Sequence, residues 1–537
     1  MTAITEGASG SRQRFPALPG WAITTAGIVA FLLLWEVVAR TLLAGSYIIA
    51  APSEIVARIG EGAALYGRAL RTTLWAALLG FLIGNATAIL LAGVASLATR
   101  AERLVQALAL VVFCLPLVAT GPILRVIFGP GIGPQVTLAA LAVYYTTLIP
   151  LLVGFKAVPS SWPDLVASYG RGRFQTLIHV RARASIPYLV AGLQIAAPAA
   201  FLGAMVGEFT GAERGLGVLT IQAIRTLDVA GTWAIAVIAT VTSIAGYVAI
   251  GWVGKRFSHG APPVLLAAPP TPDRSAPGRR IVTGVLAVVL TTVVAIGLWW
   301  ALLELFDLHP FFAKRPSDVW NYLFNLPASG ANRGRVLSAL AETLSVTVPG
   351  YIAGLVIGFL AACLFELYPA AGRAATPIAI ALRSIPIIAT APLIVLAFGR
   401  GAFGMLIIVG TLTFFPTLVA VAQGLRQTPG QVVDLFGVYR AGGVRTLVTA
   451  RIPSALPAFF AAARMAVPAA VLAATVAEWL ATGTGIGNLM ALTASTSAYN
   501  LLWSCVVVLT LVSVAGYGIV ALVERYVLHR FAPEQLR

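Results

Sequence analysis

Four stretches of the chain are nearly free of charged residues, and they constrain its fold more than any other feature. They are Trp21–Leu34, Leu104–Val118, Ile281–Leu303 and Leu501–Val523. Each approaches or reaches the ~20 apolar residues that a helix needs to cross the ~30 Å hydrocarbon core of a bilayer. A transmembrane β-barrel would alternate apolar and polar residues in segments of roughly ten, which these continuous runs do not. The sequence therefore predicts an all-α polytopic membrane protein.

The charge and cysteine content argue against other classes. Only 10% of the 537 residues are charged, whereas roughly 25% is typical of soluble proteins. The net charge of +17 could attract nucleic acid, but Lys and Arg also gather in the cytoplasmic loops of membrane proteins, and we favour this second explanation. Cys114, Cys363 and Cys505 lie inside apolar runs, as small buried residues do. We therefore expect no nucleic acid partner, disulfide framework, metal site or cofactor.

The sequence repeats itself at an offset of 270 residues. This offset joins Asp164 to Asp434 (434 − 164 = 270), Thr73 to Thr343 and many other identical pairs, without a gap from about 73–256 to 343–526. Upstream the offset is 264, so the second half gains six residues, which we expect in a loop within 325–335. The predicted domains are a first half at 21–256, a Pro-rich linker at 257–280 and a second half at 281–527, flanked by tails at 1–20 and 528–537 that we expect on the cytoplasmic side.

Six membrane spans are predicted in each half. They cover 21–43, 70–98, 104–127, 134–155, 187–209 and 231–254, and then 281–304, 342–366, 374–398, 403–424, 457–480 and 500–523. An even number of spans lets both halves enter the bilayer in the same orientation, which gives a parallel repeat of about twelve helices. Basic residues gather on one side of the predicted spans, which places both termini in the cytoplasm.

A patterned polar segment lies between the fourth and fifth predicted spans of each half. In the first half, apolar residues at helical spacing occur on both sides of Gly170, which predicts two short amphipathic helices joined by a turn at that glycine. Pro187 is expected to begin the next span. The second half keeps Asp434 and Pro457 but has Arg440 where the first half has Gly170. We expect either that the bend moves to Gly442 and Gly443 or that the two loops differ.

This segment resembles the signature loop of ABC importer permeases. Its pattern is Glu-Ala-Ala, three residues, then Gly, and Asp164 takes the place of the Glu and Gly170 that of the Gly. The resemblance implies that the loop docks onto an ATPase subunit. The candidate coupling residues are then Asp164, Ala167, Gly170, Phe174 and Pro187 in the first half and Asp434, Arg440, Gly442, Gly443 and Pro457 in the second.

Two further motifs are similar to those of nitrate, sulfonate and taurine permeases. They are the Pro-Ser that begins at Pro52 and at Pro316, and the Glu followed by Gly-x-Gly that begins at Glu208 and at Glu478. The resemblance implies two ATPase subunits, identical or different, docked at 160–182 and 430–452. It also implies an extracytoplasmic substrate-binding protein, a small solute as cargo, and a place in the bacterial inner membrane. No phosphate-binding Gly-x4-Gly-Lys-Ser/Thr motif occurs in the chain, so we expect no catalytic residues here.

Glu208 and Glu478 each end an otherwise apolar predicted span, and a carboxylate in that position is a candidate functional group. Together with Gly215, Gly217, Gly485 and Gly487 they form candidate pathway or outer-mouth residues. We favour a structural role, in which each carboxylate caps backbone N–H groups or pairs with an Arg, over substrate contact.

A twelve-helix secondary transporter driven by an ion gradient is the alternative function. Such a transporter should have acidic or His relays near the middle of the bilayer. The four histidines, by contrast, are scattered over loops and tails, so the importer permease is preferred.

Overall fold

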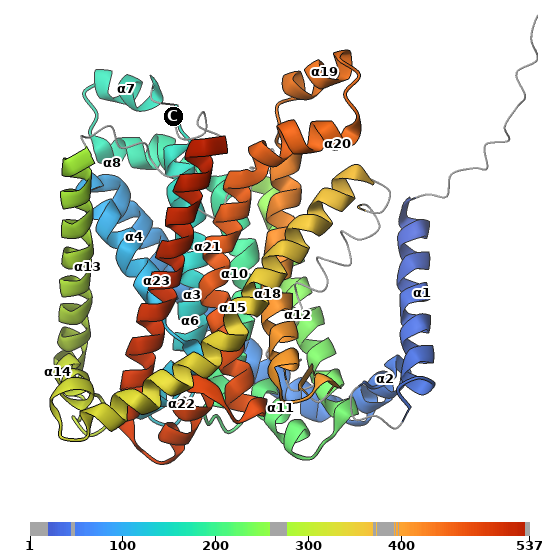
Figure 1. Cartoon of the computed structure of the whole chain (residues 1–537), viewed down its shortest axis with the longest axis vertical. Helices are drawn as coiled ribbons and strands as arrows, with labels where there is room; N and C mark the ends of the chain where they lie inside the picture. The colour runs from blue at the N-terminus through green and yellow to red at the C-terminus, as the bar shows by residue number, and fades with distance from the viewer. Residues whose placement is uncertain are drawn as a thin grey trace, which may run out of the picture.

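The computed structural model describes residues 20–44, 49–159, 161–257, 277–368, 372, 391, 394–395 and 397–531, most of which are helical, and no strand occurs among them (Figure 1). The first half contains α1 (Gly20–Arg40), α2 (Pro52–Glu61), α3 (Ala63–Leu97), α4 (Thr99–Phe113), α5 (Leu117–Phe128), α6 (Gly133–Lys156), α7 (Ser161–Ser168), α8 (Arg173–Thr176), the π-helical turn η1 (Leu177–Arg181), α9 (Ala182–Ala184), α10 (Ile186–Phe209), α11 (Leu216–Arg225) and α12 (Val229–Phe257).

Among the described residues, the second half follows a similar order, but the segment that corresponds to α4 and α5 lies largely outside them. The second half contains α13 (Pro277–Leu305), α14 (Pro316–Trp320), η2 (Asn321–Asn325), α15 (Ser329–Leu367), α18 (Ala402–Arg426), α19 (Gly430–Val438), α20 (Gly443–Thr446), η3 (Leu447–Arg451), α21 (Ile452–Ala477), η4 (Glu478–Thr482), α22 (Gly485–Ser495) and α23 (Tyr499–Phe531).

Nine helices in the described ranges are long and apolar enough to cross a bilayer, and the bent pair of α4 and α5 would make ten. These ten correspond to ten of the twelve predicted spans. Helix α1 covers most of the first predicted span, and the predicted span at 374–398 lies largely outside the described residues. The all-helical, tandem membrane fold is confirmed.

The predicted span at 104–127 is not one continuous helix, because the chain bends by 91° between α4 and α5. The bend falls at Cys114–Pro116, and Pro116 caps α5 with an extended backbone (φ −71°, ψ 101°). A proline disfavours helical geometry in the residue before it and cannot donate a backbone hydrogen bond. Helix α4 therefore ends at Phe113, and α5 starts in a new direction.

Corresponding tryptophans pair in both halves, which supports the sequence register. The rings of Trp35 and Trp233 lie 5.2 Å apart, and so do those of their counterparts Trp299 and Trp503, although the first pair is edge-to-face and the second is stacked. The indole N–H groups of Trp35 and Trp503, which are not counterparts, donate to the carbonyls of Ala50 at 3.1 Å and Phe312 at 2.9 Å. Each pair joins the first span of its half to the last.

The six extra residues of the second half are mainly helical, contrary to the predicted loop. In the first half only Gly62 separates α2 from α3, whereas three residues separate η2 from α15. Helix α15 has 39 residues and α3 has 35. Four of the six residues therefore add a turn to the start of α15, and two lengthen the connection.

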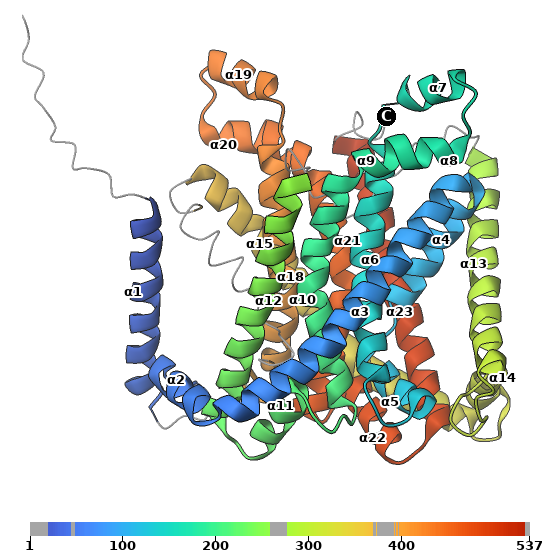
Figure 2. The same ribbon diagram turned by 180° about the vertical axis from the view of Figure 1, so that it is seen from behind.

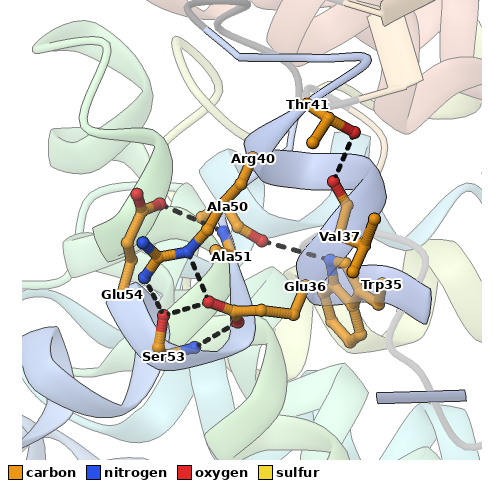
Figure 3. A network of polar contacts seen from close by, with 9 residues as sticks. All are labelled: Trp35, Glu36, Val37, Arg40, Thr41, Ala50, Ala51, Ser53 and Glu54. Atoms are coloured by element: carbon orange, nitrogen blue, oxygen red, sulfur yellow. Dashed lines mark hydrogen bonds and ion pairs between the residues drawn. The ribbon is translucent and has the colours of Figure 1, made fainter. Parts of the chain in front are cut away.

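The corner between α1 and α2 explains the first Pro-Ser motif (Figure 3). The Glu36 carboxylate accepts hydrogen bonds from the backbone N–H of Ser53 at 3.0 Å and from its hydroxyl at 2.6 Å. Glu54 accepts from the N–H of Ala51 at 3.0 Å, and Pro52, which lacks an N–H, occupies the first position of α2. The motif thus satisfies the backbone donors at the start of α2 and fixes the corner.

The two halves pack closely against each other. Helix α13 lies beside α4 of the first half (Figures 1 and 2). One buried cluster joins Val118 and Phe209 of the first half to Met405 and Ala477 of the second, and another places Ala119 and Ile123 of α5 against α22 and α23. Much of the described core therefore lies between the halves.

Candidate functional sites

Helices α7 and α19 project together from one face of the molecule (Figures 1 and 2). Neither helix has a buried residue. Leu165 and Leu435 are 58% and 54% exposed, Tyr169 and Tyr439 still more so, and Asp164 and Asp434 are exposed as well. Two equivalent helices thus offer apolar side chains to a partner without packing them against their own chain.

The turn after each helix has the same geometry in both halves. Gly170 has φ +71° and Arg440 has φ +49°, so both adopt the left-handed conformation. The N–H groups of Gly170 and Arg171 donate to Ala167 and Val166, and those of Arg440 and Ala441 donate to Gly437 and Phe436. These bonds form a Schellman motif in each half.

The predicted shift of the second bend to Gly442 and Gly443 is therefore wrong. Gly442 has φ −63° and precedes α20, as Gly172 precedes α8, and Gly443 is the first residue of α20. The backbone hydrogen bonds of the turn hold Arg440 in a conformation that costs a non-glycine residue roughly 1–2 kcal/mol. Exposed Phe174 and Val444 follow in the short helices after the turns.

Pro187 and Pro457 occupy different positions in their helices. Pro187 is the second residue of α10, close to the predicted start of the span. In the second half, α21 already begins at Ile452 and Pro457 lies inside it, so the predicted start of that span is five residues late. A membrane helix tolerates an internal proline where its surroundings satisfy the freed carbonyl.

The side-chain contacts that support α7 and α19 differ between the two halves, and the sequence pattern did not predict this difference. Beneath α7 the guanidinium of Arg181 donates to the Ser96 hydroxyl at 2.8 Å. At the equivalent positions of the second half, Arg451 forms an ion pair with Glu366. Comparing Ser96 with Glu366 at the 270-residue offset would have revealed this difference.

A cavity of about 360 Å³ lies under α7. Lys156 and Glu102, whose charged atoms are 2.6 Å apart, border it. Its other polar lining residues are Ser96, Asp164 and Arg181. Both α7 and the helices beneath it thus contribute charged side chains to the lining of this cavity.

Glu208 and Glu478 lie at the opposite face, and each is only 2% exposed. Glu208 accepts hydrogen bonds from the Thr73 hydroxyl at 2.7 Å and from the Gly217 N–H at 2.6 Å. Glu478 accepts from the Thr343 hydroxyl at 2.7 Å and the Gly487 N–H at 2.8 Å. Each carboxylate therefore caps the start of the helix that follows it, α11 or α22.

The glycines of this motif make room for the carboxylates. Gly215 and Gly485 have positive φ values of +139° and +78°, and a Cβ on either would lie 2.1 Å from a carboxyl atom of Glu208 or Glu478. A Cβ on Gly217 or Gly487 would come within 2.6 Å of a backbone carbonyl oxygen. The Gly-x-Gly sequence is thus required for the buried cap.

Arg58 and Asp228 form an ion pair at the same face, with Nη2 and Oδ2 2.6 Å apart. Partial burial alone would raise the pKa of Asp228. The hydrogen bond from Arg58, a second from the Gly231 N–H at 2.8 Å and the charge of Arg58 outweigh burial and lower this pKa below its ordinary value. The hydrogen bond and charge of Asp228 in turn raise the pKa of Arg58.

Replacing Asp228 by asparagine should therefore have a pH-dependent effect on stability. Because folding lowers the pKa of Asp228, its contribution is complete above the ordinary Asp value of ~3.9 and is lost as the pH falls through the lowered value. The pair is partly exposed, so we expect the variant to lose at most about 1 kcal/mol near neutral pH. Unfolding of both proteins at several pH values measures this difference, and a difference that grows on acidification would contradict the assignment.

Tandem helical halves with paired helices projecting from one face define a polytopic membrane protein built from two copies of one domain. The family model described as the binding-protein-dependent transport system inner membrane component matches residues 84–259 and again 354–529, which repeats the offset of 270 (354 − 84 = 270). The chain belongs to this family of ABC importer permeases, and two copies of the family domain are fused in it. It is thus a multi-pass inner membrane protein and a transport component rather than an enzyme.

Three related proteins each match less than half of this chain. A probable ABC transporter permease protein of Haemophilus influenzae is 27% identical over 226 residues, which are 42% of this chain and 92% of that protein. The formylaminopyrimidine transport permease protein of Halalkalibacterium halodurans is 37% identical over 28% of this chain and 59% of its own length. A putative aliphatic sulfonates transport permease protein of Escherichia coli is 29% identical over 28% of this chain and 55% of that protein.

Among the residues whose positions are described, no group of three His, Cys, Asp or Glu side chains could hold a metal ion.

Proposed function

We propose that this chain forms the translocation pathway of an ATP-driven importer and that α7 and α19 each dock onto an ATPase subunit. The observation that carries the proposal is the pair of exposed helices, equivalent in sequence register and in turn geometry, on one face. Membership in the family implies ATPase and substrate-binding partners in general. The energy from ATP would then be transmitted to this chain as a mechanical motion of α7 and α19.

The face that bears α7 and α19 would be cytoplasmic. Helix α1 begins at this face, and α12 and α23 end there (Figures 1 and 2). The last turns of α12 and α23 carry Lys255, Arg256 and Arg530, in keeping with the preference of basic residues for the cytoplasm. Both termini would then be cytoplasmic, and the capped helices α11 and α22 would lie at the outer mouth.

The cluster between the halves supports a pathway that is closed on the outer side. Leu138, Phe209, Met405 and Ala477 are buried together, and each lies near the end of its helix that is remote from α7 and α19. Alternating access would require this apolar contact to open when ATP draws the two coupling helices together. A binding protein would deliver the solute to that side.

The cargo is proposed to be a small polar solute. Relatives are named as permeases for formylaminopyrimidine, riboflavin, aliphatic sulfonates, nitrate and bicarbonate. These names range from small anions to a pyrimidine and a flavin, so what they share is that each is a polar small molecule, with no common charge. Selection among such solutes would rest largely with the binding protein.

Reconstitution tests the proposal. The chain, its cognate ATPase and the binding protein would be placed in proteoliposomes, and uptake of the labelled solute measured with ATP, without ATP, and with proton or sodium gradients. We expect uptake only with ATP and all three components. Gradient-driven uptake by the chain alone would support the secondary transporter instead.

The turn residues allow a test of the two docking loops. We expect Gly170→Arg to reduce ATPase association more than Arg440→Gly does, because the first change adds about 1 kcal/mol of left-handed strain and the second relieves it. Apart from the neighbouring residues of the chain, no atom in the described ranges lies within 4 Å of the position of a Cβ on Gly170, so the effect is conformational rather than steric. Co-purification of the ATPase with each variant measures it, and equal losses would show that the ranking is wrong.

A further inference from the structure

The corner between α14 and α15 presents aromatic rings beside basic side chains. Trp320 and Phe324 have ring centroids 4.5 Å apart and are 60% and 46% exposed. The guanidinium of Arg333 lies 5.5 Å from the centroid of Phe324, and Arg335 is also exposed. We call Trp320, Phe324, Arg333 and Arg335 the corner patch.

The positive charge of the corner patch is not neutralised within the described part of the protein. No described carboxylate lies within the 4.0 Å of an ion pair from either Arg333 or Arg335. The contact of Arg333 with the face of Phe324 is a cation–π interaction, which holds the guanidinium in place without cancelling its charge. Two cations therefore remain available to an anionic partner.

The corner patch occurs in the second half only. Trp320 and Phe324 correspond to Val56 and Gly60 at the offset of 264. Arg333 and Arg335 correspond to Ala63 and Leu65 at the offset of 270, and Arg333 directly follows the extra turn of α15. The shared machinery of the two halves therefore does not require these residues.

The position of the corner patch favours a lipid over a protein partner. Helix α14 lies at the edge of the molecule, at the end of α13 remote from α7 and α19 (Figures 1 and 2). Trp300, Leu302 and Leu305 near that end of α13 are exposed, as side chains that face hydrocarbon are. The patch thus begins where an apolar membrane helix ends, which is the level at which Trp concentrates at a bilayer surface.

We propose that the corner patch binds the phosphate headgroup of an anionic phospholipid, with Arg333 and Arg335 at the phosphate and Trp320 and Phe324 against the upper acyl chains. Such a lipid would hold α14 at the membrane surface and so anchor α13, which packs on α4 of the other half. Assigning this lipid to the outer leaflet rests on the membrane orientation given in the proposed function. The binding of the lipid does not depend on that orientation.

Fluorescence quenching in nanodiscs tests the proposal on the full chain. The discs would contain phosphatidylcholine with an equal fraction of tail-brominated phosphatidylglycerol or tail-brominated phosphatidylcholine. The fluorescence of Trp320 is obtained by subtracting the signal of the Trp320→Phe variant from the signal of the wild-type protein. We expect severalfold stronger quenching by the brominated anionic lipid, because each basic residue near an anionic membrane surface strengthens binding roughly fivefold. The double variant Arg333→Gln/Arg335→Gln should lose this preference but remain quenched by phosphatidylcholine.

The first half supplies a matched control. Val56→Trp places an indole at the equivalent corner, where no Arg stands at positions 63 and 65, and both lipids should quench it equally. Equal quenching of Trp320 by the two lipids, or a preference that survives the double variant, would overturn the proposal. So would protection of Trp320 from aqueous iodide by the substrate-binding protein without lipid preference, which would assign the patch to a protein. The experiment needs neither ATP nor the ATPase, so it can fail independently of the proposed function.

Discussion

Replacing Glu208 or Glu478 by alanine is expected to lower the free energy of unfolding by about 3 kcal/mol in each case, because each change leaves a buried backbone N–H unpaired and removes one acceptor of a buried Thr hydroxyl. Without Glu208 the Gly217 N–H and the Thr73 hydroxyl lose an acceptor in a site with almost no exposure. Each buried unsatisfied group costs roughly 1–3 kcal/mol. Glutamine keeps one acceptor oxygen and should lose about half as much. Thermal unfolding of the purified variants in nanodiscs measures the effect.

Glu61→Ala is the matched control, because this carboxylate ends α2 close to the start of α3 and is 69% exposed. It should unfold at nearly the wild-type temperature. If Glu208→Ala were as stable as wild type but failed to transport, the carboxylate would belong to the solute pathway and not to a structural cap. The same experiment therefore decides between the two roles that the sequence left open.

Much of the fold could be predicted from sequence because a bilayer leaves a chain few choices. Lipid cannot satisfy backbone donors, so the charge-free runs had to be helices, and the repeat transferred every assignment from one half to the other. Trp35 pairs with Trp233 and Trp299 with Trp503, which agrees with the repeat register defined by the amino-acid sequence alone.

The errors occur where one backbone conformation competes with another of similar energy. Pro116 divides the predicted third span, whereas Pro457 lies within a continuous helix, and composition alone does not separate the two cases. Arg440 keeps the left-handed turn despite the two glycines that follow it. There the hydrogen bonds of the Schellman motif outweigh the intrinsic preference of the residue, and they depend on the position of the preceding helix.

The site was predictable in position but not in detail. A polar segment between spans revealed the projecting helices, and an intramembrane carboxylate revealed the caps. Thr73 and Thr343 were visible as a repeated pair, but only folding brings each to its carboxylate from 135 residues away. The differing supports, Arg181 on Ser96 and Arg451 on Glu366, likewise depend on contacts between distant segments.

These supports bear on how evenly the two halves could couple. The ion pair beneath α19 joins two charges, whereas the bond beneath α7 joins a charge to a neutral hydroxyl. Position 162 is Trp on α7 and its counterpart, position 432, is Val on α19. The two proposed docking helices therefore have the same backbone conformation but different side chains, and each helix must be tested separately.

The double variant Leu165→Glu/Leu435→Glu is expected to weaken ATPase binding by at least about 100-fold and to abolish ATP-driven uptake. Both side chains are more than half exposed in the chain by itself. Burying a leucine against a partner contributes roughly 1.5–3 kcal/mol, and an unpaired carboxylate in the same contact opposes binding further. Affinity of the purified chain for its ATPase in nanodiscs measures the loss, and the single variants report on each docking helix.

Leu227→Glu, at a side chain equally exposed on the opposite face, is the control and should leave the affinity unchanged. If the double variant bound the ATPase as tightly as wild type, α7 and α19 would not be the docking helices, whereas unequal losses in the single variants would show that the two halves couple unevenly.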